Sequence, residues 1–453
     1  MDCLVYTKTN RNVSEYNLVL LVVTDEALHK TGIMLSSIMK HVLHCCLLLI
    51  VILIFEFVSG GLQWNIDKTE QLDPWVRYGF FGALILYLLR SVTFLSLPQV
   101  LFNFVGLTIY NAFPDKVILK GSPLLAPFIC IRIVTRGDYP QLVKTNVNRN
   151  LNKCIEAGLE NFQIEVVSDK PIGLVSHRRI TEIVVPANYR TSSGALFKAR
   201  ALQYCLENSV NELADHDWIV HLDEETLMTE NSIRGILNFV LDGKHQFGQG
   251  LITYANEDVV NWITTLADSF RVADDMGKLR LQFTMFHKPL FSMKGSYVVT
   301  QMAAEREVSF NNGLDGSVAE DCFFAMKAFS QGYTFNFVDG EMWEKSPFTL
   351  WDFVQQRKRW LQAWLCPISC SPLIDFLCAF IGAVNIYMYV FGVVKSFSLY
   401  RFGIIHFLLC LCGALSTIPF NLIIENVAVI WGLFGKKHKF YVVNKEYKPP
   451  ITV

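Results

Sequence analysis

Three consecutive carboxylates, Asp223, Glu224 and Glu225, follow directly on the apolar run Trp218–Leu222. A short apolar run of this kind is typical of a buried strand. In an open α/β sheet, ligands bind beyond the carboxyl ends of the strands. Two acids one residue apart at such a position, Asp223 and Glu225, suit a divalent cation that also holds a diphosphate. A surface loop or a helix cap without a metal is the alternative, and for an isolated acidic strand end it is the commoner outcome.

A second acidic pair, Glu320-Asp321, stands at the start of a predicted helix near Cys322. Asp321 suits a general base that takes the proton of an acceptor hydroxyl. An acid at this place is also a favourable partner of the helix dipole or an N-cap. The pair by itself leaves both interpretations open.

A third cluster, Gln356-Arg357-Lys358-Arg359-Trp360, has helical spacing. Gln356, Arg359 and Trp360 stand at i, i+3 and i+4 and therefore share one face. Arg359 suits bidentate contact with phosphate, while Trp360 suits stacking on a sugar ring with Gln356 bonding nearby. The alternative is an interfacial helix whose basic side chains reach lipid headgroups, and we expect Arg357 and Lys358 to do so.

The elements that must position these residues lie in the middle of the chain. Strands are predicted at 128–135, 162–167, 182–185 and 218–222, and helices at 141–158 and 195–207. This alternation predicts an α/β fold with a mostly parallel sheet covered by helices on both faces. The first strand is not followed by Gly-x-Gly-x-x-Gly, and the sequence has no Walker-type loop. We therefore expect a nucleotide held by strand-end acids and a metal.

The composition indicates a membrane protein rather than an ordinary soluble domain. Of 453 residues, 52% are hydrophobic and 18% are charged, and the apolar runs gather at the two ends. The formal net charge of -1 gives no basic field for a nucleic acid, so no nucleic-acid partner is expected. Twelve cysteines lack the paired spacing of a disulfide or zinc framework, which favours a reducing compartment.

Four apolar regions are long enough to contact a lipid bilayer, at 42–59, 78–113, 371–397 and 402–434. The second is interrupted by Arg90 and Pro98, which predicts one spanning helix followed by an interfacial piece. Polar groups inside these regions (Glu56, Arg90 and Glu425) either lie at headgroup depth or line a lateral groove for a lipid acceptor. The charges flanking the spans predict a cytosolic N-terminus, a cytosolic central domain and a cytosolic tail.

The central residues resemble the inverting family 2 glycosyltransferases, which have the GT-A fold. The resemblance carries over motif by motif, in the family's order. Arg136-Gly137 and Asp169 match positions that grip the nucleotide's base and ribose, and Lys198 matches a lysine-containing segment before the metal site. The later motifs are an Asp-x-Asp site at Asp223 and Glu225, in which Glu225 replaces the second Asp; a catalytic-base motif at Glu320-Asp321; and Gln-x-x-Arg-Trp at Gln356, Arg359 and Trp360.

Longer runs resemble the egghead-type β-1,4-mannosyltransferases of invertebrate animals, among them Gly295–Thr300 and Asp315–Asp321. This resemblance implies transfer of mannose from GDP-mannose to glucosylceramide, with Mg²⁺ or Mn²⁺ as cofactor, in the ER or Golgi. One departure stands out. The family has a longer segment with an additional span after the Gln-x-x-Arg-Trp helix, where only Leu361–Cys370 intervene here, and the loss of one span reverses the side of the tail.

These expectations divide the chain into six parts. They are a loosely ordered cytosolic leader (1–41), an N-terminal transmembrane region (42–113), a cytosolic GT-A domain (114–350), an interfacial helix with the Gln-x-x-Arg-Trp motif (351–370), a C-terminal transmembrane region (371–434) and a basic tail (435–453). Two rival functions remain. A polysaccharide synthase like those that make cellulose or hyaluronan needs a translocation channel, which few spans make hard to build. A catalytically silent membrane scaffold is disfavoured by the intact acids Asp223 and Asp321.

Overall fold

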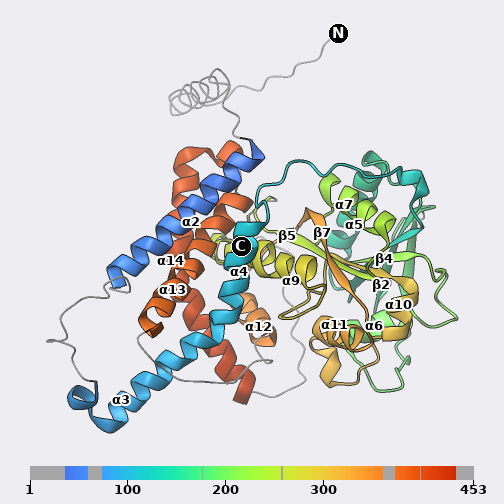
Figure 1. Ribbon diagram of the computed structural model, residues 1–453. Helices are drawn as coiled ribbons and strands as arrows, with labels where there is room; N and C mark the ends of the chain where they lie inside the picture. Colours follow the sequence, from blue (N-terminus) through green and yellow to red (C-terminus); the bar gives the residue numbers. More distant parts are fainter. Residues whose placement is uncertain are drawn as a thin grey trace, which may run out of the picture.

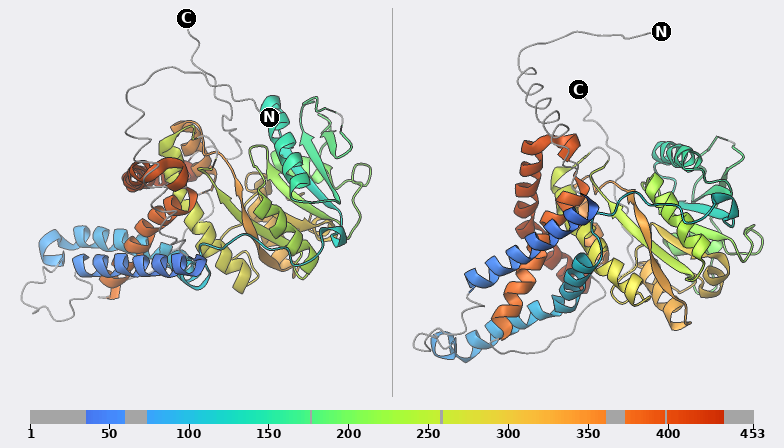
Figure 2. Two further views of the ribbon diagram at one scale, coloured as in Figure 1. Left: turned by 90° about the horizontal axis from the view of Figure 1, so that it is seen from above. Right: turned by 45° about the horizontal axis from the view of Figure 1, so that its top comes forward.

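The protein has two parts that lie side by side, a domain built on a β-sheet and a group of long helices (Figure 1 and Figure 2). The structure is a computed structural model that describes residues 36–59, 74–175, 177–256, 259–360, 373–397 and 399–434. The predicted leader before residue 36, the segment Leu361–Cys370 and the basic tail lie outside this range. Helix α12 (Leu350–Trp360) lies between the two parts.

The central sheet has seven strands in the order β3-β2-β1-β4-β6-β5-β7. All neighbouring pairs are parallel except those that β6 forms with β4 and β5. The expectation of a mostly parallel sheet is therefore confirmed. The strands are β1 (Ile129–Thr135), β2 (Phe162–Ser168), β3 (Ile180–Val184), β4 (Trp218–Asp223), β5 (Phe247–Thr253), β6 (Val298–Gln301) and β7 (Phe335–Trp343).

Helices cover both faces of the sheet, as predicted. Successive side chains of a strand point to opposite faces, and β1 accordingly sends Ile129, Ile131 and Ile133 into one apolar cluster and Cys130 into another. The first cluster is closed by α5 (Pro140–Glu156) and α7 (Glu230–Asp242), and the second by α6 (Phe197–Tyr204), α10 (Met302–Val308) and α11 (Glu320–Ser330). A longer helical stretch, α8 (Trp262–Asp274), the π-helical turn η4 (Asp275–Leu279) and α9 (Arg280–Met285), faces the membrane part.

Among the described residues, three helices are long and apolar enough to cross a membrane. They are Ser37–Ser59 in α2, Phe376–Ser396 in α13 (Leu373–Ser396) and Gly403–Ala428 in α14 (Leu399–Phe434). The region predicted at 78–113 forms instead α3 (Pro74–Thr93), a 3₁₀ turn η2 (Phe94–Ser96) and α4 (Leu97–Ile109). None of these is among the three helices found in the described part of the chain.

Polar groups of α2 face protein. His44 is hydrogen-bonded to Tyr387 of α13 through Nδ1 (2.5 Å) and to the carbonyl oxygen of Leu107 of α4 through Nε2 (3.1 Å). Glu56, at the other end of α2, is 1% exposed. Glu56 is therefore buried, while the side chain of Arg90 lies outside the described part of the chain.

The membrane helices contact the α8–η4 stretch through backbone atoms. A Cβ at Gly392 of α13 would lie 1.8 Å from the carbonyl oxygen of Ser269, and one at Gly106 of α4 would lie 2.1 Å from that of Gly277. Any side chain at either glycine would push the helices apart. The catalytic part and the membrane part are therefore packed as closely as two backbones allow.

Candidate active site

The carboxyl ends of β1, β2 and β4 meet at one edge of the sheet. Chain order reverses between β1 and β4, because β2 and β3 extend on one side of β1 and β4 lies on the other. Such a switch point is where open α/β sheets bind ligands. The sequence-predicted residues Arg136, Asp169 and Asp223 all stand at the ends of these three strands.

Five residues at the ends of β1 and β2 and on α6 form what we call the outer half of the site. Asp169 forms an ion pair with Arg200 of α6 (2.5 Å between Oδ1 and Nη2). Asp138 bridges Arg136 (3.5 Å) and Lys170 (2.5 Å). Most of these side chains are partly exposed, and Arg136 is 53% exposed. The outer half therefore presents both carboxylates and cations to solvent.

Four residues form the inner half: Lys198, Asp223, Glu320 and Asp321. Lys198 Nζ lies 2.6 Å from Asp223 Oδ1 and 3.9 Å from Glu320 Oε1, and it donates a hydrogen bond to the carbonyl oxygen of Gly295 (2.8 Å). A Cβ at Gly295 would lie 3.2 Å from Lys198 Nζ and 3.6 Å from Asp321 Oδ2. The absence of a side chain at Gly295 thus lets these charged groups converge.

Helix α11 supplies the two acids of the inner half from its first turn, and both are partly buried. Burial, together with the neighbouring charge of Asp321, raises the pKa of Glu320 to about 7. Burial likewise raises the pKa of Asp321, although the hydrogen bond from the Cys322 N–H and the charge of Lys198 act in the opposite direction. Burial alone would lower the pKa of Lys198, but Asp223 and Glu320 raise it above its usual value. The inner half therefore combines the Lys198 cation with two carboxyls whose pKa values are raised, that of Glu320 to about 7.

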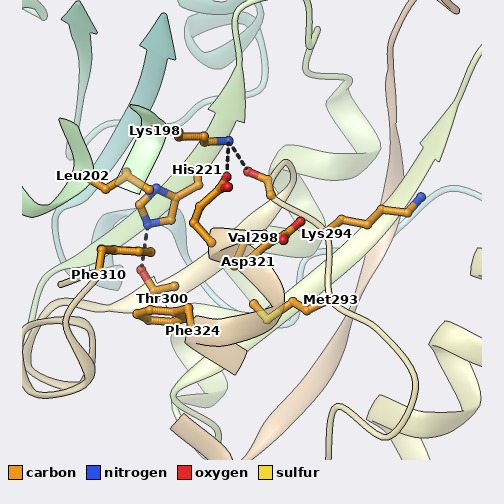
Figure 3. A pocket seen from close by; sticks show the side chains of 12 residues that line it. Lys198, Leu202, His221, Met293, Lys294, Val298, Thr300, Phe310, Asp321 and Phe324 are labelled. Carbon is orange, nitrogen blue, oxygen red and sulfur yellow. Dashed lines mark hydrogen bonds and ion pairs between the residues drawn. The ribbon is translucent and has the colours of Figure 1, made fainter. Parts of the chain in front are cut away.

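A pocket with about 310 Å³ of empty space, partly open to solvent, adjoins the inner half. In Figure 3, Lys198 and Asp321 border this pocket, and the apolar side chains of Met293 and Phe324 lie on its lower side. The remaining lining residues are Leu202, His221, Lys294, Gly295, Val298, Thr300, Phe310 and Glu320. Charged groups on one side and apolar groups on the other suit a ligand with polar and apolar faces, such as a sugar ring.

The acidic turn after β4 is held from two sides. On the β1 side, the hydroxyl of Thr135 donates a hydrogen bond to Glu224, and Asn146 donates to the backbone carbonyl of Glu224 (2.9 Å). On the β7 side, Leu227 and Trp343 exchange two backbone hydrogen bonds (2.8 and 2.9 Å). Glu224 is consequently buried, while Asp223 and Glu225 are only partly buried.

The acidic turn after β4 offers carboxylate oxygens of the kind that a hard divalent cation prefers. Asp223 offers a carboxylate that already binds a cation, the Lys198 ammonium, at 2.6 Å, and Mg²⁺ and Mn²⁺ prefer oxygen ligands. Asp223 and Glu225 are thus the residues that could hold the ion. When bound, such an ion stabilises the negative charge that develops on a departing diphosphate.

The Gln-x-x-Arg-Trp residues are on α12, which starts beside α14. Gln356 is partly buried, and its Oε1 has no hydrogen-bond partner among the described residues. Arg359 and Trp360 lie in the last turn of α12, and their side chains are outside the described part of the structure, as is that of Lys358.

The expectation that Arg357 reaches lipid headgroups is wrong. Arg357 is buried, its Nη2 lies 2.9 Å from Oδ1 of Asp268 on α8, and its guanidinium stacks on Phe353 (4.8 Å). Burying a charge is costly unless it is paired, and Asp268, which is 0% exposed, provides the pair. Arg357 therefore joins α12 to the catalytic domain.

Two histidines that stand out in the sequence have structural partners. His221 Nε2 lies 2.6 Å from the carboxylate of Glu305, and Glu305 also pairs with the buried Arg132 (3.3 Å). His287 stacks on His245 with ring centroids 4.3 Å apart. Both histidines are therefore held by contacts within the domain.

Sequence reasoning missed three residues of the site. Arg200 lies two residues after Lys198 and pairs with Asp169, and its place in the same predicted helix was the available signal. Gly295 accepts the bond from Lys198 through its carbonyl oxygen. Glu344, the residue after β7, accepts a hydrogen bond from the Thr226 hydroxyl (2.6 Å), and its position at a strand end was a signal of the same kind as that of Asp223.

The parallel strand ends, the acidic turn and the partly buried acid pair, together with apolar spanning helices, define a membrane-associated glycosyltransferase with a GT-A fold. The model of the family described as "Glycosyl transferase family group 2" matches residues 218–434. A β-1,4-mannosyltransferase of Drosophila melanogaster, egh, is 66% identical over 457 residues, covering 92% of this chain and 100% of the relative. The chain therefore belongs to the β-1,4-mannosyltransferase family.

Further relatives have the same activity in their names. The β-1,4-mannosyltransferases bre-3 of Caenorhabditis briggsae and Caenorhabditis elegans are 56% and 55% identical, each covering 90% of this chain and 98% of the relative. Among solved structures, a mannosyltransferase from Pyrobaculum calidifontis in complex with GDP-Man and Mn²⁺ has a TM-score of 0.42 and 13% identity, covering 77% of this chain and 99% of that one.

Proposed function

We propose that this enzyme transfers mannose from GDP-mannose to the glucose of glucosylceramide, forms a β-1,4 linkage and uses Mg²⁺ or Mn²⁺. The observation that carries the proposal is the inner half, in which the partly buried acids of α11, the cation of Lys198 and the strand-end acid Asp223 converge. The names of the relatives support the sugar and the linkage. The donor's base and the lipid acceptor follow from the egghead-type resemblance.

The reaction inverts the anomeric carbon in one displacement. The O4 hydroxyl of glucose attacks C1 of mannose, the bond from C1 to the phosphate oxygen breaks, and its electron pair leaves with GDP. Asp321 takes the proton of the attacking hydroxyl, since burial raises the pKa of its carboxyl and the Cys322 N–H holds it in place (2.8 Å). Lys198 supplies a fixed positive charge between the acid turn and α11.

The outer half suits a guanine nucleotide. A carboxylate can accept hydrogen bonds from N1–H and the 2-amino group of guanine, and a guanidinium can donate to O6 and N7. Asp169 and Arg200 stand 2.5 Å apart at the end of β2 and thus offer both groups together. Uracil has one N–H between two carbonyls, so it would engage the carboxylate less fully.

The three apolar helices make the enzyme a membrane protein in this proposal, within the ER or Golgi and with the catalytic domain in the cytosol. The bilayer is then the source of the acceptor. On α12, the buried Oε1 of Gln356, which has no partner in the described residues, suits a bond to the acceptor sugar. Arg359 and Trp360 would contribute phosphate and sugar contacts from the same helix.

The test is an assay on membranes that contain the full chain, with several radiolabelled nucleotide sugars and defined glycolipid acceptors. We expect transfer from GDP-mannose to glucosylceramide and a loss of about 10³-fold in Asp321→Asn, since a general base contributes roughly 10² to 10⁴. A matched variant, Asp242→Asn, removes an exposed carboxylate paired with Lys244 at the end of α7 and should keep full activity. Release of a polymer would instead support a polysaccharide synthase, and no transfer from any donor would support a silent scaffold.

A further inference from the structure

Glu344 is a buried acid at the edge of the site that the mechanism above does not use. It directly follows β7 and is 9% exposed, and its backbone N–H donates to the carbonyl oxygen of Thr253 (3.0 Å). Asp223 contributes to raising the pKa of Glu344, so the two carboxylates are electrostatic neighbours. A buried carboxylate next to another acid is costly, and its presence requires a compensating role.

A continuous chain of hydrogen bonds joins Glu344 to Asp223. The Thr226 hydroxyl donates to Glu344 Oε1 (2.6 Å), Thr226 and Ser296 are bonded through their hydroxyls (2.8 Å), and the Asp223 N–H donates to Ser296 Oγ (3.2 Å). A hydroxyl has a single proton, and the hydroxyl of Thr226 donates to Glu344 Oε1. Thr226 therefore gives its proton to Glu344, and Ser296 gives its proton to Thr226. The carboxylate fixes the direction of every bond up to the backbone of Asp223.

Cations on the opposite side balance the charge of Glu344. The charges of Lys294 and Arg271 both lower its pKa. Lys294 in turn pairs with Asp275, and Arg271 lies 3.5 Å from Asp268, the partner of Arg357. Glu344 therefore interacts electrostatically with Arg271 of α8 and with Lys294, which pairs with Asp275 of η4.

We propose that Glu344 is a positioning residue for the cation site: through Thr226 and Ser296 it holds the backbone of Asp223 in the conformation that binds the divalent ion. This inference rests on the proposed function for the identity of the ion site. It predicts that Glu344 acts on cation affinity, and not only on folding. Residues that orient metal ligands typically change metal affinity by about 10- to 100-fold when they are replaced.

The test measures Mn²⁺ binding to the purified full chain in detergent by electron paramagnetic resonance, without donor or acceptor. We expect the dissociation constant of Mn²⁺ to rise about tenfold in Glu344→Gln, which removes the charge, and in Thr226→Val, which breaks the chain. Thr226→Ser keeps the hydroxyl and should restore the wild-type value. In transferase assays, Glu344→Gln should raise the Mn²⁺ concentration at half-maximal rate while leaving kcat at saturating Mn²⁺ within about threefold.

The matched control is Glu305→Gln. Glu305 is also a buried carboxylate that accepts from a threonine hydroxyl, that of Thr300, but it lies beneath His221 and Arg132. Its replacement should lower the unfolding temperature without changing the Mn²⁺ dissociation constant. If Glu344→Gln behaves in the same way, Glu344 is purely structural and the inference is overturned. If Asp223→Asn also leaves Mn²⁺ binding unchanged, the ion site of the proposed function is itself misplaced.

Discussion

The outer and inner halves of the site use similar residue types in opposite environments. Asp169 and Arg200 form a partly exposed ion pair with a nitrogen–oxygen distance of 2.5 Å. Asp223 and Lys198 form an ion pair of similar length, 2.6 Å, beside the two partly buried acids of α11. Water screens the charges of the first pair. Burial raises the pKa of Glu320 to about 7 in the second. In the proposed mechanism the outer half, with its exposed charges, serves substrate recognition. The inner half, with its raised carboxyl pKa values, serves proton transfer.

Of the variants that test the difference between the two halves, Lys198→Met in the inner half should have the largest effect on kcat/KM. The change removes the charge between Asp223 and Glu320, and kcat/KM should fall about 10²-fold, the scale of losing one electrostatic donor. Because Lys198 lowers the pKa of Glu320, the acidic limb of the pH–rate profile should move to higher pH. Steady-state kinetics from pH 5.5 to 9 check both, and an unshifted limb would contradict the charge assignment.

The second prediction concerns pH and Glu320→Gln. Burial and the charge of Asp321 raise the pKa of Glu320 to about 7, so Glu320 takes up a proton as the pH falls through that value. Replacing Glu320 with glutamine removes this titration, and the acidic limb of kcat/KM should therefore shift to lower pH. The rate at pH 8 should fall less than about tenfold. An acidic limb that moves upward would show that Glu320 stabilises the charged form of Asp321.

In the outer half, Arg200→Ala should weaken recognition without touching the chemistry. The KM for GDP-mannose should rise about tenfold while kcat changes little, since one charged hydrogen bond contributes roughly 1.5–3 kcal/mol. Competition by GDP and UDP measures the discrimination, and we expect the advantage of GDP to shrink. A fall in kcat at constant KM would instead show that Arg200 acts in the chemical step and not in donor binding.

The smallest effect is expected from Lys170→Ala. Its ion pair with Asp138 is 2.5 Å long, but the lysine side chain is 61% exposed. Exposed pairs of this kind contribute about 0–1 kcal/mol. Thermal unfolding should therefore be nearly unchanged, and the KM for the donor should change less than about threefold. A large change in either would mean that the outer half is less screened than its exposure implies.

Local sequence patterns predicted the sheet well. The apolar β-branched runs at 128–135 and 162–167 became β1 and β2 within one residue, and the acids expected at strand ends lie there. Such runs are informative because a buried parallel strand needs apolar side chains on both faces. Chain order alone then brings Asp169, Lys198 and Asp223 to one edge.

Long-range pairing could not be predicted in the same way. Arg357 looked like an interfacial residue because its neighbours are basic and aromatic, but its partner Asp268 lies 89 residues earlier in the chain. Glu344 is likewise defined by Thr226, which is 118 residues away. A charged side chain in a sequence carries no sign of burial when its counter-charge comes from a distant element.

Helices α13 and α4 touch the catalytic domain through backbone atoms. Gly392 lies against Ser269 and Gly106 against Gly277, with no room for a side chain between them. The catalytic domain therefore cannot tilt or shift against these helices without first separating the two pairs of backbones.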